Sequence, residues 1–167
     1  MKFIFEAEWN LMQISQQTDY AMRILIFLGT MPASQGPWPA RHIADVYQIQ
    51  LSHLNKAIQA LADKGYVRAS AGRNGGISLN VHPWELSLGD VMRCTEPEWN
   101  QSDCLRGCED TCILATICQV KKEFLKSMGV FLERLDQVTL EDVLINRKEL
   151  SDVFWDRLEA NGHVTLV

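Results

Sequence analysis

Apolar side chains recur at helical spacing in three stretches of the first half of the chain. The first begins after Thr18, whose side chain is suited to cap a helix, and ends before a loop rich in Pro, Gly and Ser at residues 31–39. A short amphipathic stretch covers Ile43–Tyr47, and another begins at Ser52, its predicted cap, and ends before Gly65. This pattern predicts three helices with a short turn between the second and the third.

After Gly65, apolar and polar residues alternate instead of recurring at helical spacing. Residues Tyr66–Ala69 and Ile77–Leu79 alternate as strands do, and the glycine-rich segment 72–76 between them is typical of a tight turn. Helix, turn, helix and hairpin in this order are typical of a winged helix-turn-helix. We therefore predict a mainly α protein with a small β-wing, followed by one short helix over Pro83–Arg93.

A longer apolar seam begins after residue 116. Its six positions are spaced 3, 4, 4, 3 and 4 residues apart, which is heptad spacing: Ile117, Val120, Phe124, Met128, Phe131 and Leu135. A long helix after a small winged domain has little surface of its own chain to cover. The seam therefore predicts a dimerisation helix and a homodimer, with packing against its own domain as the alternative.

The chain divides by composition into five parts. These are an N-terminal extension (1–11), a winged helix-turn-helix domain (12–93), a cysteine-rich loop (94–118), a dimerisation helix with the following helix start (119–145) and an acidic C-terminal segment (146–167). Within them, Thr139-Leu140-Glu141-Asp142 resembles a helix start with acids in its first turn, and Glu149–Glu159 is predicted to be a further, mostly acidic helix.

Composition is that of one globular domain, since 47% of the 167 residues are apolar and 22% are charged. No run of about 18 apolar residues is present, so we expect no membrane span and a cytoplasmic protein. The net charge is −5, but residues 38–80 hold five basic and two acidic residues, a local balance of +3. A basic segment in an acidic chain indicates a local nucleic-acid surface.

Short polar residues and a cation at the start of the second predicted helix of the helix-turn-helix could contact DNA. The candidates there and at the wing tip are Ser52, His53, Asn55, Lys56, Arg73 and Asn74. Asn55 is suited to adenine, whereas Ser52 and Lys56 are suited to phosphate or guanine. A glycine-rich tip lets the wing backbone approach a minor groove. The alternative is a winged helix that contacts only protein.

Four of the five cysteines lie within residues 104–118, and Cys94 is the fifth. In a cytosolic protein such a cluster is more often metal-binding or redox-active than a disulfide framework. The absence of a C-x-x-C pair weakens a zinc knuckle or a thioredoxin motif, whereas iron–sulfur clusters accept broader spacing. Ordinary thiols, structural zinc and a thiol–disulfide switch remain alternatives. No nucleophile–base pair or phosphate loop is present, so we expect no enzyme.

Six motifs in order along the chain, together with the cysteine loop, identify a known family. They are Thr18-Asp19-Tyr20-Ala21-Met22-Arg23, Ile43-Ala44, Leu51-Ser52, Gly65-Tyr66-Val67, Gly72-Arg73-Asn74-Gly75-Gly76-Ile77 and Val138-Thr139-Leu140-Glu141-Asp142. Over about residues 12–144 the chain resembles the winged-helix iron–sulfur transcription regulators, and within them the nitric-oxide-sensing branch more than the cluster-assembly branch.

This resemblance implies a 2Fe–2S or 4Fe–4S cluster held by Cys104, Cys112 and Cys118, whose seven and five intervening residues are similar to the nitric-oxide-sensing branch. Cys108 is then an extra thiol or an alternative ligand. The cluster-assembly branch has a His three residues after the last Cys, where this chain has Lys121. The resemblance also implies Asp19 as a fourth ligand donated across the dimer; the alternative is an ordinary acid in the first turn of a helix.

The function implied is a homodimeric transcription regulator, a repressor by resemblance, that binds a double-stranded DNA operator. Its affinity would be set by the cluster, which senses nitric oxide or redox state. The alternatives are a regulator of iron–sulfur cluster supply and a thiol-based or zinc-containing winged-helix regulator. An electron-transfer or thiol-exchange protein is disfavoured, because it has no use for the glycine-rich wing and the basic segment.

Overall fold

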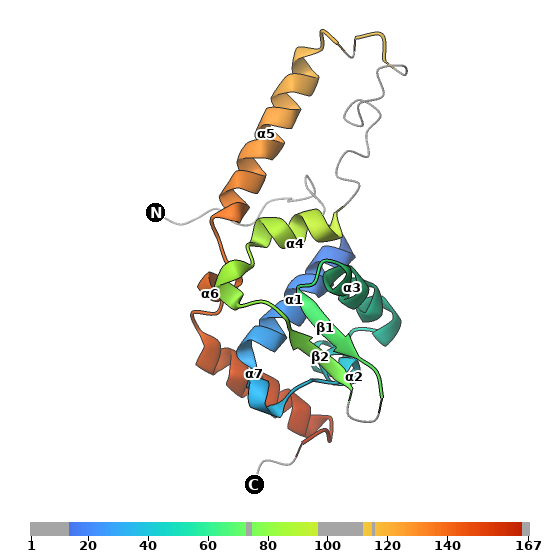
Figure 1. Ribbon diagram of the computed structural model, residues 1–167, viewed down its shortest axis with the longest axis vertical. Helices are drawn as coiled ribbons and strands as arrows, with labels where there is room; N and C mark the ends of the chain where they lie inside the picture. Colours follow the sequence, from blue (N-terminus) through green and yellow to red (C-terminus); the bar gives the residue numbers. More distant parts are fainter. Residues whose placement is uncertain (1–13, 73–74, 97–111, 115, 165–167) are drawn as a thin grey trace.

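The computed structural model describes residues 14–72, 75–96, 112–114 and 116–164 (Figure 1). The chain order of its elements is α1 (Gln16–Thr30), η1 (Ala33–Gln35), α2 (Ala40–Tyr47), α3 (Leu51–Asp63), β1 (Val67–Ser70), β2 (Gly76–Leu79), η2 (Pro83–Glu85), α4 (Leu88–Thr95), α5 (Gln119–Asp136), α6 (Leu140–Val143) and α7 (Arg147–Ala160). The predicted fold class, mainly α with a small β-wing, is confirmed. In the described part of the chain, no helix is both long and apolar enough to cross a membrane.

Helix α1 lies at the centre of the molecule (Figure 1). It packs against α2, α3, α4, α6, α7 and β2. Its side chains Ala21, Ile24, Leu25 and Phe27 are fully buried, because apolar residues at this spacing fall on more than one face of the helix. The helix-turn-helix, the wing and the C-terminal helices are therefore held to one another mainly through α1.

Helices α2 and α3 form the helix-turn-helix, and the hairpin of β1 and β2 is the wing. Gln48, which ends α2, has φ 55°, a left-handed conformation that turns the chain sharply towards α3. The two strands pair antiparallel, with Val67 opposite Leu79 and Ser70 opposite Gly76. Trp38 adds a third short segment to this sheet through two backbone hydrogen bonds with Ile77, of 2.8 and 2.9 Å.

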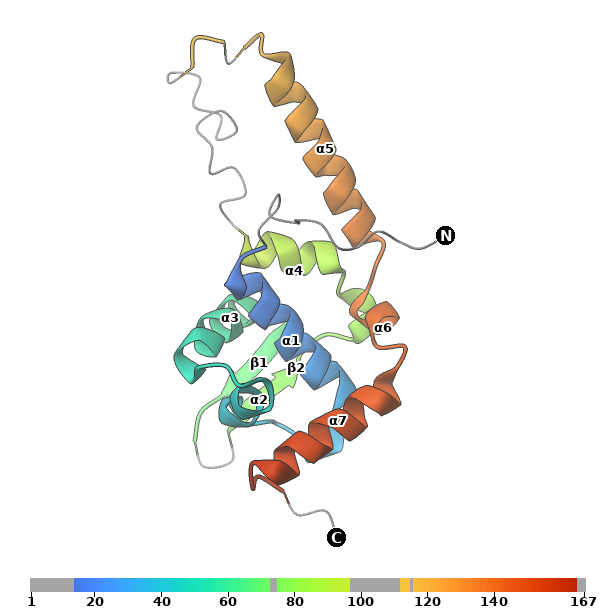
Figure 2. The same cartoon turned by 180° about the vertical axis from the view of Figure 1, so that it is seen from behind.

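Helix α7 returns to the body and closes the core, lying across the end of α1 and beside α2 (Figure 2). Phe154 is buried, with its ring centroid 5.1 Å from that of Phe27 and 5.7 Å from that of Tyr47. Just beyond the helix, His163 Nε2 lies 2.8 Å from Asp45 Oδ2 on α2. The acidic C-terminal helix predicted from the sequence thus contributes to the same core as the helix-turn-helix.

Helix α5 projects away from the body (Figure 1), and none of its residues is buried. Its base is fixed by Arg93 of α4, whose guanidinium donates two hydrogen bonds of 2.6 and 2.7 Å to Asp136. This hydrogen-bonded pair holds the pKa of the Asp136 carboxyl below its usual value. Further out, three residues of the predicted seam are exposed: Ile117 (67%), Val120 (61%) and Phe124 (58%).

Three local expectations from the sequence are wrong. Ser15, and not Thr18, caps α1, because the Thr18 hydroxyl is engaged with side chains near the end of α4. Ser52 does not cap α3; it lies inside the helix, after Gln50 at the cap position. The helix predicted over residues 83–93 is split into η2 and α4, because Ser87 and Asp90 form a capping box that starts a new helix.

The close approach of the wing to Trp38 requires glycine at position 76. A Cβ atom there would lie 2.7 Å from the backbone carbonyl carbon and oxygen of Trp38, which are held in the sheet and cannot move aside. We expect Gly76→Ala to lower the free energy of unfolding by about 1–3 kcal/mol. Ser78→Ala in the same strand is the control, with an expected change within about 0.5 kcal/mol. Urea denaturation of both variants measures the difference; equal stabilities would contradict the steric argument.

Candidate nucleic-acid interface and cysteine site

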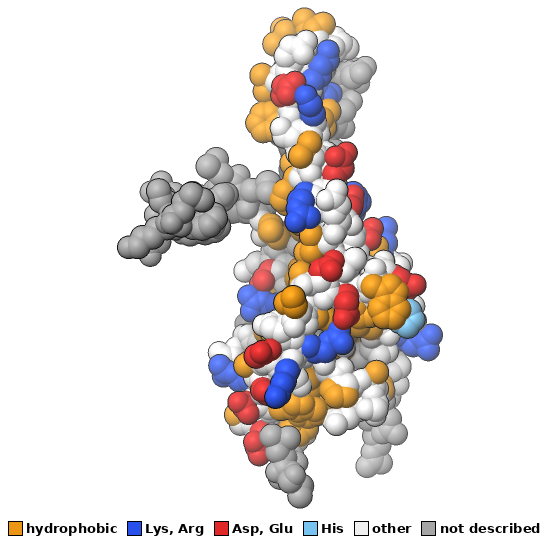
Figure 3. All heavy atoms as spheres, turned by 90° about the vertical axis from the view of Figure 1, so that its left-hand side faces the viewer, with side chains coloured by type: hydrophobic (Ala, Val, Ile, Leu, Met, Phe, Trp, Pro, Cys, Tyr) orange, Lys and Arg blue, Asp and Glu red, His pale blue; other side chains and the backbone are white. Residues whose placement is uncertain are grey.

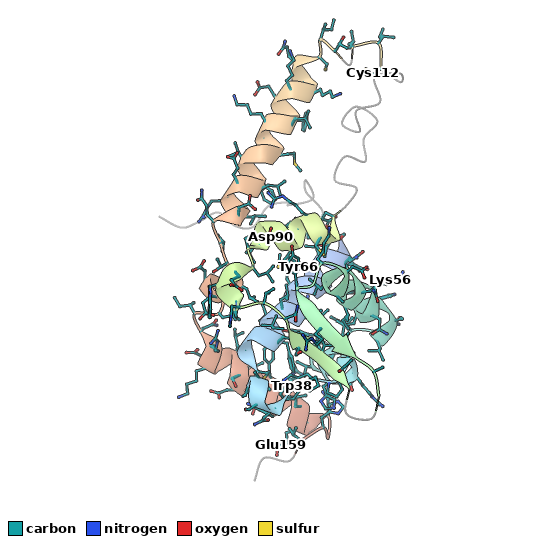
Figure 4. All side chains as sticks on the ribbon, in the orientation of Figure 1. Trp38, Lys56, Tyr66, Asp90, Cys112 and Glu159 are labelled. Carbon is teal, nitrogen blue, oxygen red and sulfur yellow. The ribbon has the colours of Figure 1, made fainter. Side chains whose placement is uncertain are left out.

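The exposed side of α3 is the candidate nucleic-acid interface. Four of the six DNA-contacting residues predicted from the sequence are exposed there: Ser52, His53, Asn55 and Lys56. The wing-tip candidates Arg73 and Asn74 lie outside the described residues. The helix is held in place by its opposite side, on which Leu54, Ala57 and Leu61 are fully buried. The polar side chains of α3 are thus presented to solvent on a rigid support, as Lys56 shows in Figure 4.

Three exposed cations of the basic segment were not assigned to the interface from the sequence: Lys64 at the end of α3, Arg68 and Arg41. Arg68 lies on β1, which packs against α3, and its guanidinium donates a long hydrogen bond of 3.4 Å to Asn80. Arg41 lies on α2 with its Nε 3.6 Å from Asp45 Oδ2. These cations could not be assigned to the interface from the sequence, because the sequence shows their charge but not that their side chains are exposed next to α3.

The start of α1 contacts both helices of the helix-turn-helix. The ring of Tyr20 stacks against that of His53 on α3, with centroids 6.4 Å apart and planes 14° from parallel. Asp19 forms an ion pair of 2.9 Å with Arg23, and the Arg23 guanidinium lies 5.6 Å from the centroid of the Tyr47 ring at the end of α2. Burial raises the pKa of the Tyr47 phenol, so this ring stays neutral.

A hydrogen-bond network ties the start of α1 to the end of α4. The Thr18 hydroxyl lies 2.7 Å from that of Thr95, which itself donates to the carbonyl of Val91 at 2.9 Å. Glu96 accepts hydrogen bonds from the backbone N–H of Ser15, at 2.7 Å, and from the Thr18 hydroxyl. Because Glu96 directly precedes residues 97–111, this network stands where the chain enters the cysteine-rich loop.

The two described cysteines of the loop, Cys112 and Cys118, precede α5 in the chain and are half-buried free thiols. Cys118 occupies the cap position of α5, and Cys112 is labelled in Figure 4. Cys104 and Cys108 lie outside the described residues. In the part of the chain that the structure describes, no three His, Cys, Asp or Glu side chains are placed to hold a metal ion. The two thiols have the donor chemistry that an iron–sulfur cluster requires, and a complete set needs residues from the loop or from a second chain.

Asp19 does not lie near these thiols within one chain. It is on α1 in the body, whereas Cys112 precedes the outer end of α5, whose 18 residues span about 27 Å (Figures 1 and 4). A role for Asp19 in the same cluster as Cys112 and Cys118 therefore requires donation from another protomer.

Cys94 belongs to a different environment from the loop thiols. It lies on α4, and its thiol donates a hydrogen bond of 3.2 Å to the carbonyl of Ala60 on α3. Burial raises the pKa of this thiol, which disfavours the thiolate form that iron requires. The position and hydrogen bond of Cys94 therefore argue against a role as a ligand beside Cys104, Cys112 and Cys118, which the family resemblance implies.

Exposed apolar atoms run along α5 between Lys and Glu side chains (Figure 3). The large exposed side chains at and before this helix are Ile113, Leu114, Ile117, Val120, Phe124, Leu125 and Val130. Large apolar side chains exposed in this number on one helix are typical of an interaction surface.

Comparisons with known proteins agree with this geometry. The family model Rrf2, described as iron-dependent transcriptional regulator, matches residues 14–146. The chain is 39% identical over 139 residues to the HTH-type transcriptional regulator NsrR of Bacillus licheniformis, covering 83% of this chain and 96% of that protein. Among solved structures, IscR of T. potens is similar with a TM-score of 0.63 and 23% identity, covering 83% of this chain and 90% of that one.

A second solved structure, CymR of B. subtilis, described as the global cysteine regulator, superposes with a TM-score of 0.61 and 24% identity. It covers 80% of this chain and 96% of its own. At these identities the two solved structures establish the fold, whereas the family model and the NsrR relative establish the family.

Two buried threonines on α1 provide a matched test of the network at Glu96. Thr18 is 1% exposed and fully hydrogen-bonded, whereas Thr30 is 7% exposed and its hydroxyl has no partner among the described residues. We expect Thr18→Val to lower the free energy of unfolding by about 1–3 kcal/mol, since it leaves Glu96 short of a donor. Thr30→Val should be neutral or stabilising, because it removes an unpaired polar group. Chemical denaturation decides this, and equal effects would contradict it.

Proposed function

The chain belongs to the Rrf2 family of iron-dependent transcriptional regulators, and from this premise we propose that it is a homodimeric, cytoplasmic DNA-binding regulator. Its affinity for an operator is set by an iron–sulfur cluster that senses nitric oxide or redox state. The observation that carries the proposal is the exposed polar side of α3 in a winged helix-turn-helix, together with a projecting helix α5 that begins directly after the free thiol Cys118.

DNA binding is assigned to α3 and the wing. Helix α3 presents Ser52, Asn55 and Lys56 for the major groove, and Arg68 lies beside it on β1. Lys and Arg fix the register on the phosphates, whereas hydroxyl and amide groups contact base edges. The net charge of −5 keeps the rest of the surface from attracting DNA, so binding is confined to this side.

Homodimer formation is assigned to α5. Its outer apolar residues, including Val120 and Phe124, are exposed in the single chain and would be removed from water by a second α5. A two-fold arrangement presents two copies of α3 to successive turns of a palindromic operator. It also permits Asp19 of one chain to reach the loop thiols of the other.

Cluster binding is assigned to Cys104, Cys112 and Cys118, with Asp19 of the partner subunit as the fourth ligand. When bound, the cluster supplies iron that reacts with nitric oxide or with oxidants. The chain's own part is to hold three thiolates, of which that of Cys118 is at the N-cap position of α5.

The chain also supplies the connection between the loop and α3. Glu96, at the entry to the loop, is hydrogen-bonded to Ser15 and Thr18 at the start of α1. One turn along, Tyr20 stacks on His53 of α3. A change in the loop that displaces Glu96 therefore alters the support of α3, and the two copies of α3 in a dimer then no longer match the operator spacing.

The central test measures DNA binding in two states of the protein. Anaerobically purified protein is used to select duplexes from a random library, and binding to the selected duplex is measured before and after addition of nitric oxide. We expect at least a tenfold loss of affinity after the addition. Lys56→Ala should weaken binding to selected and random duplexes alike and lower the salt slope by about one. A protein that selects no sequence, or whose affinity does not change, would overturn the proposal.

Cysteine variants test the ligand set. Cys104→Ala, Cys112→Ala and Cys118→Ala should each abolish iron and sulfide binding, since the loss of one thiolate leaves the set incomplete. Cys108→Ala should retain the cluster, and Cys94→Ala is the control, because its thiol is bonded to α3. Iron and sulfide analysis of anaerobically purified proteins measures the outcome. Loss of the cluster in Cys108→Ala with retention in Cys104→Ala would reverse the assignment.

A pair of variants tests the dimer and the fourth ligand. Phe124→Asp should give a folded monomer by sedimentation, because Phe124 is exposed in the single chain and a charge in an apolar seam costs several kcal/mol. Asp19→Ala should remain dimeric and bind iron through three thiolates, but with an altered absorption spectrum and a changed rate of reaction with nitric oxide. Unchanged spectrum and kinetics would make Asp19 an ordinary first-turn acid paired with Arg23.

A further inference from the structure

The buried side of α3 determines which of its side chains point straight away from the protein. The buried residues, 0–7% exposed, are Leu54, Ala57, Ile58 and Leu61. Successive side chains of a helix are rotated by about 100° about its axis. We call the direction opposite to the mean direction of the buried side chains the outward direction. Four side chains point within about 30° of it and form one stripe. This outward stripe consists of Ser52, Lys56, Gln59 and Asp63.

Two of the residues predicted to contact bases lie to the sides of this outward stripe. By the same spacing, Asn55 is about 70° and His53 about 90° from the outward direction. His53 is also engaged with the ring of Tyr20. Gln59 is thus the amide side chain nearest the middle of the surface that α3 presents to a groove.

The orientation of the Gln59 amide is fixed by Asp63. Gln59 Nε2 donates a hydrogen bond of 2.6 Å to Asp63 Oδ1, one helical turn further along. An ionised carboxylate only accepts hydrogen bonds, so the NH₂ group, and not the oxygen, must face Asp63. One N–H of this group and the Oε1 oxygen remain free for another partner.

We propose that Gln59 reads one adenine in each operator half-site and that Asp63 is the positioning residue that sets the direction of its amide. The free N–H is suited to adenine N7 and the free oxygen to the adenine N6 amino group, which is how an amide pairs with adenine in the major groove. This inference rests on the DNA-binding function proposed above and adds a specificity residue to it.

The first experiment repeats selection from a random duplex library with Gln59→Ala. We expect the variant to lose the preference at one adenine-containing base pair per half-site. Its affinity for the duplex selected by the unaltered protein should be about 5- to 150-fold weaker, which is the effect of losing one good bidentate contact. Binding to random duplexes should not change. Gln137→Ala, at the end of α5, is the matched control, and thermal unfolding verifies that both variants fold.

The second experiment uses Asp63→Asn. The asparagine amide can donate or accept, so it no longer fixes the Gln59 amide, and a reversed amide can approach guanine instead. We expect the preference at that base pair to broaden from adenine to both purines, while affinity for random duplexes stays the same or rises because one negative charge is lost. A role in helix stability alone would lower all binding and leave the preference intact, which would overturn the part assigned to Asp63.

The outcomes separate this inference from the proposed function. If the unaltered protein selects no sequence, the DNA-binding function itself fails. If it selects a sequence and Gln59→Ala selects the same one with the same affinity, only the reading role of Gln59 fails. Equal loss of affinity for selected and random duplexes in Gln59→Ala would indicate a backbone contact and also overturn the reading role.

Discussion

Burial of α1 is the constraint on which the rest of this structure depends. The ring of Phe27 contacts two other parts of the chain. Its centroid lies 5.4 Å from that of Trp38, in the segment that extends the wing, and 5.1 Å from that of Phe154 on α7. Since α1 also packs on α2, α3, α4 and α6, separate parts of the chain share one core. Close-packed interiors do not deform continuously, so a displacement at one end of α1 must be accommodated by the elements around it.

At the start of α1, the shared core contains a network of buried polar groups. Thr18 and Thr95 are buried hydroxyls whose oxygens lie 2.7 Å apart. Thr18 donates to Glu96, and Thr95 donates to the carbonyl of Val91. Buried polar groups are costly unless they are all satisfied, so this network has one stable arrangement. In the function that we propose, Glu96, the residue before segment 97–111, links the state of the loop to the support of α3.

Helix α5 has the opposite character, since none of its residues is buried and its base is attached to α4. Arg93 and Asp136 fix that base, while Val120 and Phe124 remain in water. An ion pair of this kind, largely exposed, contributes little to stability but orients the helix. The apolar seam is therefore best understood as a surface whose partner is a second chain, as we propose for the homodimer.

The sequence by itself determined the fold class, the helix-turn-helix, the wing and the long heptad helix, because hydrophobic spacing and glycine-rich turns are local signals. It also supplied the cysteine spacing and the family. The tertiary structure decided that Ser15 and not Thr18 caps α1, since the Thr18 hydroxyl donates to Glu96, 78 residues away. It also showed that the amide of Gln59, which lies nearer the outward direction of α3 than that of Asn55, is held by a hydrogen bond to Asp63.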